Sequence, residues 1–501
     1  MEVATQNIKI ETNELLNEFK HHLGIENNKR ILFSGPFGTG KSTFLKEFSE
    51  TEKENFFYLK IFPVNYSVSK NEDVFELIKF DLLLQLLGNY NEEIKLEKED
   101  FNVLLKIQVF MMERMKFTPL LYAILGFSEK LGTPLTKLIE AAVSIYGSYE
   151  KFSAEIKIDE EKQIHTFLEF IQQKSGSHHE MDTVSELIFD LIGRIKTSNP
   201  EKESVLIIDD LDRLDPEHIF RLFNIFSAHY DEIKGENKFG FDKVIFVCDI
   251  ENIRKIFHHK YGQGVDFSGY IDKFYSIVPF DFNNRMYIKA KTGELLREIR
   301  FSSDYLQQTY NFYRNTRFFT TFKALTLSLI EARLLNLRML IQYPVLNVPE
   351  FYIGNGKNSV DSPLIVLFYL LKNFYCSFDI LQMKIIEMKE KFDTETFLSN
   401  HENQYMVNNE GEIKNLISYC LSYLLPDEKA NEDNTKEPKT FFLEKYNCTF
   451  HYNGFGNNYD LFYNYIKSTR GNSPNTEPIK LNPYQILSDT FEICNKRGLL
   501  R

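Results

Sequence analysis

The 501-residue sequence predicts an α/β fold in which helices cover both faces of a parallel sheet. Several short runs are almost continuously apolar, which is typical of strands that are buried on both faces. Segments with apolar residues at helical spacing alternate with these runs, and this alternation indicates a sheet with crossover helices. A chain of this length that is 43% hydrophobic can bury a large core, so we expect two or three domains.

Five apolar runs are the expected strands of the sheet. They are ILFS, which begins at Ile31, FFYLKIF at 56–62, SVLIIDD at 204–210, KVIFVCD at 243–249 and SIVPF at 276–280. A short helix at 12–24 precedes the first strand, with Thr12 as its N-cap and Gly24 as its stop signal. Two further helices are expected at 71–87 and at 216–233, the latter opened by Asp215 as cap and Pro216 in the first turn.

The rest of the chain is expected to be mostly helical. Residues 1–88 and 201–285 form the predicted core, and the long amphipathic segments of 89–200 indicate a helical insertion into it. Residues 286–425 are expected to be a helical lid followed by a helical domain, and the charged, proline-bounded stretch 426–439 is the clearest linker. Residues 440–501 are expected to form a small accessory unit, because aromatic and polar residues alternate there and an Asn-Gly pair predicts a hairpin.

Charge and cysteine content narrow the range of partners and compartments. With 71 Asp and Glu against 59 Lys and Arg, the chain has no overall positive field that would attract nucleic acid or anionic membranes. This composition does not exclude a local basic groove. The five cysteines form no C-x-x-C pair, which favours reduced thiols and a cytoplasmic location. The N-terminal residues do not resemble a signal peptide, and the apolar stretch at 117–128 is too short to cross a bilayer.

A glycine-rich loop after the first expected strand carries the strongest chemical signal. Residues 35–42 fit the pattern G-x-x-x-x-G-K-[ST], between a strand and a helix. In this pattern backbone N–H groups curl around phosphates, Lys41 reaches the β- and γ-phosphates, and the hydroxyl of Ser42 holds Mg²⁺. The expected nucleotide-binding residues are Gly35, Pro36, Phe37, Gly38, Thr39, Gly40, Lys41, Ser42 and Thr43.

Carboxylates follow two of the other expected strands. Asp209 comes where a buried strand ends, and a metal held by Ser42 needs a carboxylate at that edge of the sheet. Asp210 is then the candidate that orients the attacking water. Capping of the next turn is the expected role of Asp215 and an alternative for Asp212. Asp249 ends another strand, and its pattern fits a γ-phosphate or water sensor and the N-cap of the next helix equally well.

These segments together resemble the KAP family of P-loop NTPases over about residues 10–335. The resemblance rests on GPFGTGKST, VLIIDDLDRLD, VIFVCD, YIDKFYSIVPF and NTRFFTTFKAL. It implies a sheet of order 5-1-4-3-2, a large insertion between the glycine-rich motif and the acidic motif, and a helical subdomain after the sheet. It also implies ATP with Mg²⁺ as ligands, since the sequence has no N-K-x-D motif for reading guanine.

The resemblance further implies two basic residues that act on the nucleotide. Lys273 would donate charge to a nucleotide on this or a neighbouring subunit, and Arg317, at the start of the lid helix, would match a sensor arginine. Without the resemblance, both residues are expected to be solvated surface charges. The resemblance also implies a link to defence against phage, with which bacterial relatives are frequently associated. The chain is expected to form a homo-oligomer and to act on a protein partner or effector.

Three functions are consistent with the sequence. The first is an ATPase in which hydrolysis moves the helical lid against the core. The second is a slowly hydrolysing, nucleotide-dependent switch or scaffold that recruits a partner. The third is a nucleic-acid sensor, whose binding would weaken steeply with salt.

Overall fold

A computed structural model gives the structure of the chain, and it forms two compact units, Asn13–Asn283 and a second one that contains Asn284–Arg501. The described residues are 12–66, 74–94, 183–228, 237, 239–310, 316–341, 345–354, 357–393, 410–425, 438–454, 463–472, 477–479 and 481–501. Each unit has its own hydrophobic core. The predicted division into core, insertion, helical region and accessory unit is finer than this and stays a prediction.

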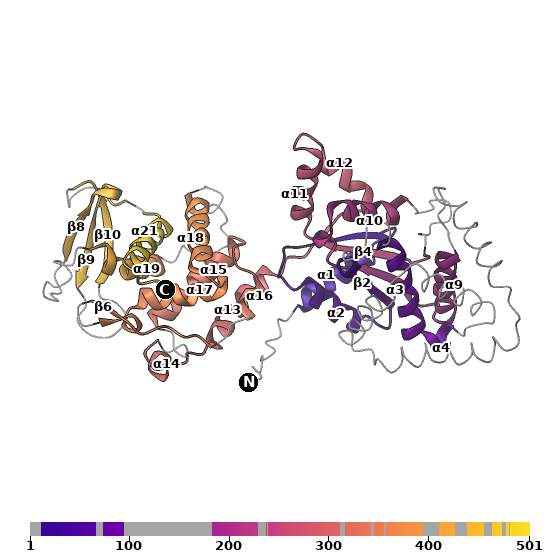
Figure 1. Cartoon of the computed structure of the whole chain (residues 1–501), viewed down its shortest axis with the longest axis horizontal. Helices are drawn as coiled ribbons and strands as arrows, with labels where there is room; N and C mark the ends of the chain where they lie inside the picture. Colours follow the sequence, from indigo (N-terminus) through magenta and orange to yellow (C-terminus); the bar gives the residue numbers. More distant parts are fainter. Residues whose placement is uncertain are drawn as a thin grey trace, which may run out of the picture. The chain divides into compact units, whose positions relative to one another are not determined.

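The first unit is built on a five-stranded parallel sheet (Figure 1), whose order β2-β3-β4-β1-β5 confirms the expected 5-1-4-3-2 arrangement. Its strands are β1 (Arg30–Ser34), β2 (Phe56–Ile61), β3 (Glu203–Ile208), β4 (Lys243–Cys248) and β5 (Phe280–Asp281). All of them run in the same direction, so their carboxyl ends meet at one edge of the sheet. Loops that follow these strands can therefore form a common site.

Helices cover both faces of this sheet, as the apolar strands predict. One face carries the row Leu32, Phe246 and Ile208, and α3 (Val74–Asn89), α9 (Thr183–Ser198) and α10 (Pro216–Ala228) supply the side chains of the same core. The opposite face carries Phe33, whose ring contacts Phe19 of α1 (Asn13–Leu23) and Phe44 of α2 (Lys41–Thr51). The remaining described helices of this unit are α4 (Asn91–Ile94), α11 (Ile250–Tyr261) and α12 (Phe267–Ile271).

The fifth strand was predicted at 276–280, and this prediction is wrong in its position. The structure forms β5 only at Phe280–Asp281, where Phe280 pairs with Phe33 of β1. The N–H groups of Ser276 and Phe282 bond to the carbonyls of Arg30 and Ser34, so six residue steps on this segment oppose four on β1, and the two extra residues interrupt the ladder before Phe280. Ser276 instead accepts hydrogen bonds at Oγ from the backbone N–H groups of Lys29 and Arg30, at 3.1 and 2.8 Å.

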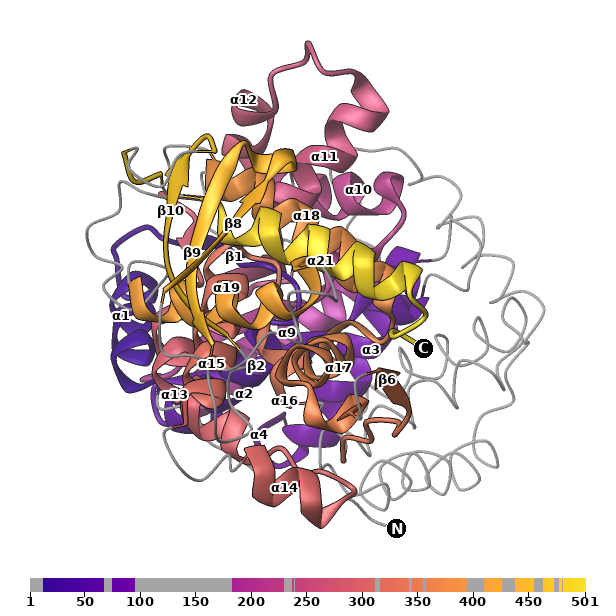
Figure 2. The same cartoon turned by 90° about the vertical axis from the view of Figure 1, so that its left-hand side faces the viewer.

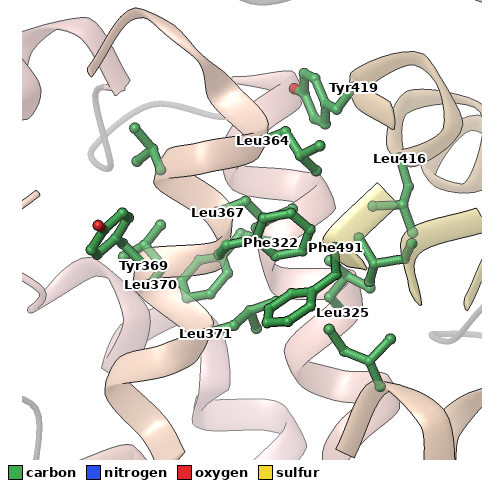
Figure 3. Close-up of a cluster of buried hydrophobic side chains, with 14 of the residues drawn as sticks. Phe322, Leu325, Leu364, Leu367, Tyr369, Leu370, Leu371, Leu416, Tyr419 and Phe491 are labelled. Carbon is green, nitrogen blue, oxygen red and sulfur yellow. The ribbon is translucent and has the colours of Figure 1, made fainter. Parts of the chain in front are cut away.

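The second unit is mostly helical. Its helices are α13 (Arg285–Arg297), α14 (Asp304–Tyr310), α15 (Arg317–Glu331), α16 (Leu337–Ile341), α17 (Pro363–Tyr375), α18 (Phe378–Asp393), α19 (Glu410–Leu424) and α21 (Pro483–Lys496). Nearly every residue of α17 is buried, because α15, α19 and α21 surround it with apolar side chains such as Phe322 and Phe491 (Figure 3). Two short strands, β6 (Tyr352–Gly354) and β7 (Lys357–Asn358), form a separate ribbon.

The end of the chain adds a three-stranded antiparallel sheet, β10-β9-β8, which lies beside α19 and α21 (Figure 2). Its strands are β8 (Lys439–Leu443), β9 (Cys448–Gly454) and β10 (Tyr463–Arg470). An antiparallel strand pair forms here as β9 and β10, but the Asn-Gly pair is not its turn, because Asn453 and Gly454 pair with Asn464 and Tyr463 within the ladder. Phe450 and Tyr452 are buried in the same core as α17, so these aromatic side chains are core residues and do not form a surface for stacking bases.

Two expectations lie partly outside the described residues. Most of the predicted insertion at 89–200, and most of the linker at 426–439, lie outside the described residues. The last amphipathic segment of the insertion is confirmed as α9. Among the described helices none is long and apolar enough to cross a membrane by itself; α17 and α18 meet the length and composition criteria only as a pair, bent by 98°. All five cysteines are free thiols.

Candidate functional site

The glycine-rich loop lies at the carboxyl edge of the sheet, between β1 and α2. Gly38 and Gly40 have φ angles of 72° and 93°, which a residue with a Cβ adopts only with strain. Gly35 donates its N–H to the carbonyl of Cys248 in β4 at 3.1 Å, and a Cβ on Gly35 would come within 2.9 Å of the Phe282 carbonyl. The glycines therefore fix the path of the loop for local steric reasons.

Lys41 is held inside this loop. Only 8% of its surface is exposed, and its Nζ donates hydrogen bonds to the carbonyls of Gly35 at 2.6 Å and Pro36 at 3.2 Å. The exposed ring of Phe37 lies 5.4 Å from the same Nζ. This arrangement places an ammonium group inside the loop. On nucleotide binding, a phosphate would replace the carbonyls of Gly35 and Pro36 as the partner of this ammonium group.

Helix α2 begins directly after the loop and has no side-chain cap. Its N-cap residue is Gly40, and its first turn is Lys41, Ser42 and Thr43. The unpaired N–H groups of a first helical turn carry partial positive charge that favours an anion. Ser42 is half-buried and Thr43 is exposed, while Thr39 bonds the Pro36 carbonyl at 2.8 Å. The loop and the helix start thus present main-chain donors and one ammonium in the same place.

Asp209 and Asp210 follow β3 at this edge but have different surroundings. The side chain of Asp209 is fully buried; its Oδ1 accepts the N–H of Asp210 at 2.8 Å, and Oδ2 lies 2.8 Å from Nζ of Lys60. No hydrogen bond of normal geometry reaches Oδ2 from any described residue, in spite of this short ion-pair distance. Asp210 has a left-handed backbone with φ 57°, and its carboxylate forms a partly exposed ion pair with Arg213 at 2.9 Å.

Asp212 is the residue that the sequence did not assign to the site. Its carboxylate is only 5% exposed and accepts the backbone N–H of Asp249 at 2.9 Å, so it joins the end of β3 to the end of β4. Burial raises the pKa of Asp212 to about 6, against the charge of Lys41 and the hydrogen bond from Asp249. Lys41 and Asp212 thus lie close enough for their charges to interact. The only sequence signal was a third acid, spaced by one buried leucine from Asp210.

The three remaining candidates have different environments. Asp249 caps α11, since its Oδ1 accepts the N–H groups of Glu251 and Asn252 at 3.1 and 3.4 Å. Of its two predicted roles, N-cap and phosphate or water sensor, this is the N-cap. Lys273 is exposed on a single turn after α12. Arg317 is the first residue of α15, exposed, in the second unit. The structure therefore brings Lys41, Asp212 and Asp249 together, and it leaves the roles of Lys273 and Arg317 as predictions.

The residues at this edge fit a magnesium-bound nucleotide. A hydroxyl and a buried carboxylate are oxygen ligands that Mg²⁺ prefers, and Asp209 Oδ2 is a buried acceptor without a normal hydrogen bond. The loop offers a backbone cradle at Gly38 and Gly40 that only glycine conformations produce. Among the described residues no cluster of three or more His, Cys, Asp or Glu side chains forms an alternative metal site.

The fold and this edge define a P-loop NTPase domain: a parallel sheet with a strand inserted between β1 and β3, a glycine-rich loop after β1 and acids after β3. A comparison with protein families matches residues 11–339 to the KAP family P-loop domain. Since this match covers more than half of the chain, the chain belongs to the KAP family. A search of curated proteins finds no match.

Replacing Gly40 by alanine tests whether the backbone of the loop binds the ligand. A Cβ at φ 93° costs about 1–2 kcal/mol of stability, and the loop is expected to relax away from the phosphate-binding conformation. Gly262, which follows α11, has the same φ of 93° but a ψ of 152°, and a Cβ there would have nothing within 4 Å, so it is the control for backbone strain away from the loop. Both variants should lose stability in urea denaturation, but only Gly40→Ala should lose nucleotide affinity in a fluorescence titration. Equal affinities for the two variants would contradict the role of the loop.

Proposed function

We propose that this chain binds ATP with Mg²⁺ at residues 35–43 and hydrolyses it. The observation that carries the proposal is the position of Lys41, which lies within the loop at the uncapped start of α2 and close to the buried Asp212. Membership of the KAP family supports nucleotide binding independently of this geometry.

In this proposal each residue has a separate task. Main-chain N–H groups of the loop and Lys41 bind the phosphates, and Ser42 with Asp209 holds Mg²⁺. The metal, when bound, neutralises developing negative charge on the transferred phosphoryl group. Asp210 accepts a hydrogen bond from the attacking water and orients it, after its carboxylate separates from Arg213. Asp212 stabilises the charge of Lys41 and keeps the ends of β3 and β4 in register.

The same proposal assigns a task to the second unit. Arg317, at the start of α15, would act as a sensor arginine, and Lys273 would act on a nucleotide of this or a neighbouring subunit. The family resemblance supports extending the proposal to self-association, to a protein partner and to defence against phage in the cytoplasm. Light scattering with and without ATP tests the first of these, because ATP-driven assembly must increase the measured mass.

One observation favours a second candidate, a slowly hydrolysing switch. The carboxylate expected to orient water is already paired with Arg213 at 2.9 Å, on the partly exposed side of its turn. If this pair persists with nucleotide bound, binding would be tight while turnover is slow.

Phosphate release by the purified chain, measured with ATP at saturating and at zero Mg²⁺, tests the proposal. An ATPase should release phosphate only with the metal, and Arg213→Ala should leave or raise the rate because it frees Asp210. A switch should bind ATP with the metal present but release phosphate in less than stoichiometric amount over minutes. Absence of any ATP binding under both conditions would overturn both candidates.

A further inference from the structure

A partly buried lysine on the edge strand β2 contacts Asp209, the carboxylate proposed to hold the metal. Lys60 lies within β2, and its Nζ is 2.8 Å from Asp209 Oδ2; the side chains are 16% and 0% exposed. A lysine is seldom buried without a partner, because removing its charge from water is costly. The pair is therefore the reason that Lys60 is tolerated among the apolar residues of this strand. The sequence signal was this one charged residue within the run FFYLKIF.

Three contacts fix the position of Lys60. The side-chain amide of Gln85 in α3 accepts the Lys60 N–H at 3.3 Å and donates to the Lys60 carbonyl at 2.8 Å, so it pairs with the free edge of the strand. Gln85 is held in turn by Asp81 at 2.9 Å. The ring of Phe62 lies 4.7 Å from Lys60 Nζ and shields the ammonium from one side.

The direction of the side chains places the pair under the phosphate-binding helix. Residues on a strand alternate between faces, so Lys60 shares a face with Tyr58, and the ring of Tyr58 contacts Phe48 of α2. Helix α2 covers this face, and its first turn contains Lys41 and Ser42. The Lys60 ammonium and the proposed metal ligands therefore belong to the same face and the same edge of the sheet.

We propose that Lys60 is the resident counter-ion of Asp209, which Mg²⁺ must displace from Oδ2 when a nucleotide binds. This inference rests on the proposed function, because it requires Mg²⁺ and nucleotide at the loop. Oδ1 is occupied by the Asp210 N–H, so Oδ2 is the oxygen that the ammonium and the metal share. Lys60 is a positioning residue: it lowers the affinity of the empty site for a metal and makes metal binding depend on the phosphates.

The charges predict the sign of the effect. Two cations that compete for one carboxylate oxygen weaken each other's binding, so loss of the ammonium must strengthen the contribution of Mg²⁺. The measurable quantity is the metal ratio: the affinity for a fluorescent ATP analogue with Mg²⁺ divided by the affinity with EDTA. Lys60→Gln, which keeps a hydrogen-bond donor but no charge, should raise this ratio about tenfold.

The experiment compares Lys60→Gln in the wild-type chain and in an Asp209→Asn background. If Lys60 acts through Asp209, the substitution changes the metal ratio in the first background and has no effect in the second. An effect of the same size in both backgrounds would mean that Lys60 contacts the phosphates directly, and this would overturn the proposal. Lys196→Gln is the matched control, since it breaks an ion pair of 2.7 Å to Asp242 in the same unit. It should leave the metal ratio unchanged.

Stability supplies a readout without nucleotide. Lys60→Met leaves Asp209 buried and unpaired, so its Tm should fall by about 10 °C, and the double variant with Asp209→Asn should recover most of this loss. Mg²⁺ alone should raise the Tm of Lys60→Met more than that of the wild type. Equal metal ratios for wild type and Lys60→Gln, with normal nucleotide binding in both, would overturn the role of Lys60 and leave the proposed function intact. Absence of nucleotide binding by the wild type would instead overturn the proposed function itself.

Discussion

Replacement of Lys41 by alanine is expected to lower the ATP turnover of the chain by about 100-fold or more. The ammonium group of Lys41 lies inside the loop and donates hydrogen bonds to the carbonyls of Gly35 and Pro36. In the proposed reaction it would stabilise the negative charge that develops on the γ-phosphate. Its loss removes charge stabilisation in the transition state and contact with the bound phosphates, so both kcat and affinity should fall. Phosphate release at several ATP concentrations separates the two effects.

A lysine five residues further along the same helix provides the control. Lys46 lies on the exposed side of α2, where it is 3.9 Å from Glu50 and 67% exposed. Lys46→Ala changes helix charge by the same amount, and such surface pairs contribute little to stability. It should leave turnover within about twofold of the wild type. Equal turnover in Lys41→Ala and Lys46→Ala would show that the loop takes no part in ATP hydrolysis.

Replacement of Asp212 by asparagine is expected to make the protein more stable and less active. Burial raises the pKa of Asp212 from its ordinary value to about 6, so ionisation of this group opposes folding above that pH. The native state binds the proton more tightly than the unfolded state does. Its contribution to stability is therefore complete below about pH 4 and is lost as the pH rises through about 6. Asparagine avoids this loss and should gain about 1–3 kcal/mol at pH 8, with little gain at pH 4.

Denaturation in urea between pH 4 and pH 8 measures this gain, and Asp242→Asn provides a control of opposite sign. Burial acts to raise the pKa of Asp242 as well, but hydrogen bonds from Lys196 and Ser204 outweigh it and hold the pKa below its usual range. Asp242→Asn should therefore lose stability at pH 7, and this difference should shrink as the pH falls. If Asp212→Asn were less stable than the wild type at pH 8, the contacts of the carboxylate with Asp249 and Lys41 would outweigh the cost of its burial, and the predicted gain would be wrong.

The gain in stability should accompany a loss of activity. Asp212 lies close enough to Lys41 for their charges to interact, so its neutralisation alters the field in which the lysine binds phosphate. Residues that weaken a fold are commonly retained because a site needs them. Turnover of Asp212→Asn should fall by about tenfold, while unchanged turnover would assign Asp212 to the fold alone.

The sheet and the loop could be predicted from the sequence because both depend on local patterns. Apolar runs with a helix between them indicate buried parallel strands, and β1 to β4 lie where these runs occur. The spacing of glycines with Lys41 specifies a backbone conformation by itself. The prediction of the fifth strand was wrong in position because two extra residues between Ser276 and Phe282 interrupt the pairing with β1, and hydrophobicity alone does not reveal such an irregularity.

The two residues that the sequence did not assign depend on contacts between distant segments. Asp212 becomes part of the site through the N–H of Asp249, the residue that directly follows β4. Lys60 pairs with Asp209, which is placed beside it only after β2 and β3 align. The deeply buried α17 in the second unit is a similar case, because its apolar residues cover the whole helix and show no single face. Such contacts follow from the three-dimensional arrangement and not from spacing along the chain.

The central claim is that one magnesium-bound triphosphate contacts both the loop after β1 and the acid after β3. Pulsed electron paramagnetic resonance with Mn²⁺ in place of Mg²⁺ measures this directly, because phosphorus nuclei within bonding distance of the metal produce a hyperfine coupling. The account predicts a phosphorus coupling in the wild type with ATP, a weaker signal in Lys41→Ala because less nucleotide is bound at the same concentration, and weaker metal binding in Asp209→Asn. Mn²⁺ bound without a phosphorus coupling, or a coupling unchanged in both variants, would contradict it.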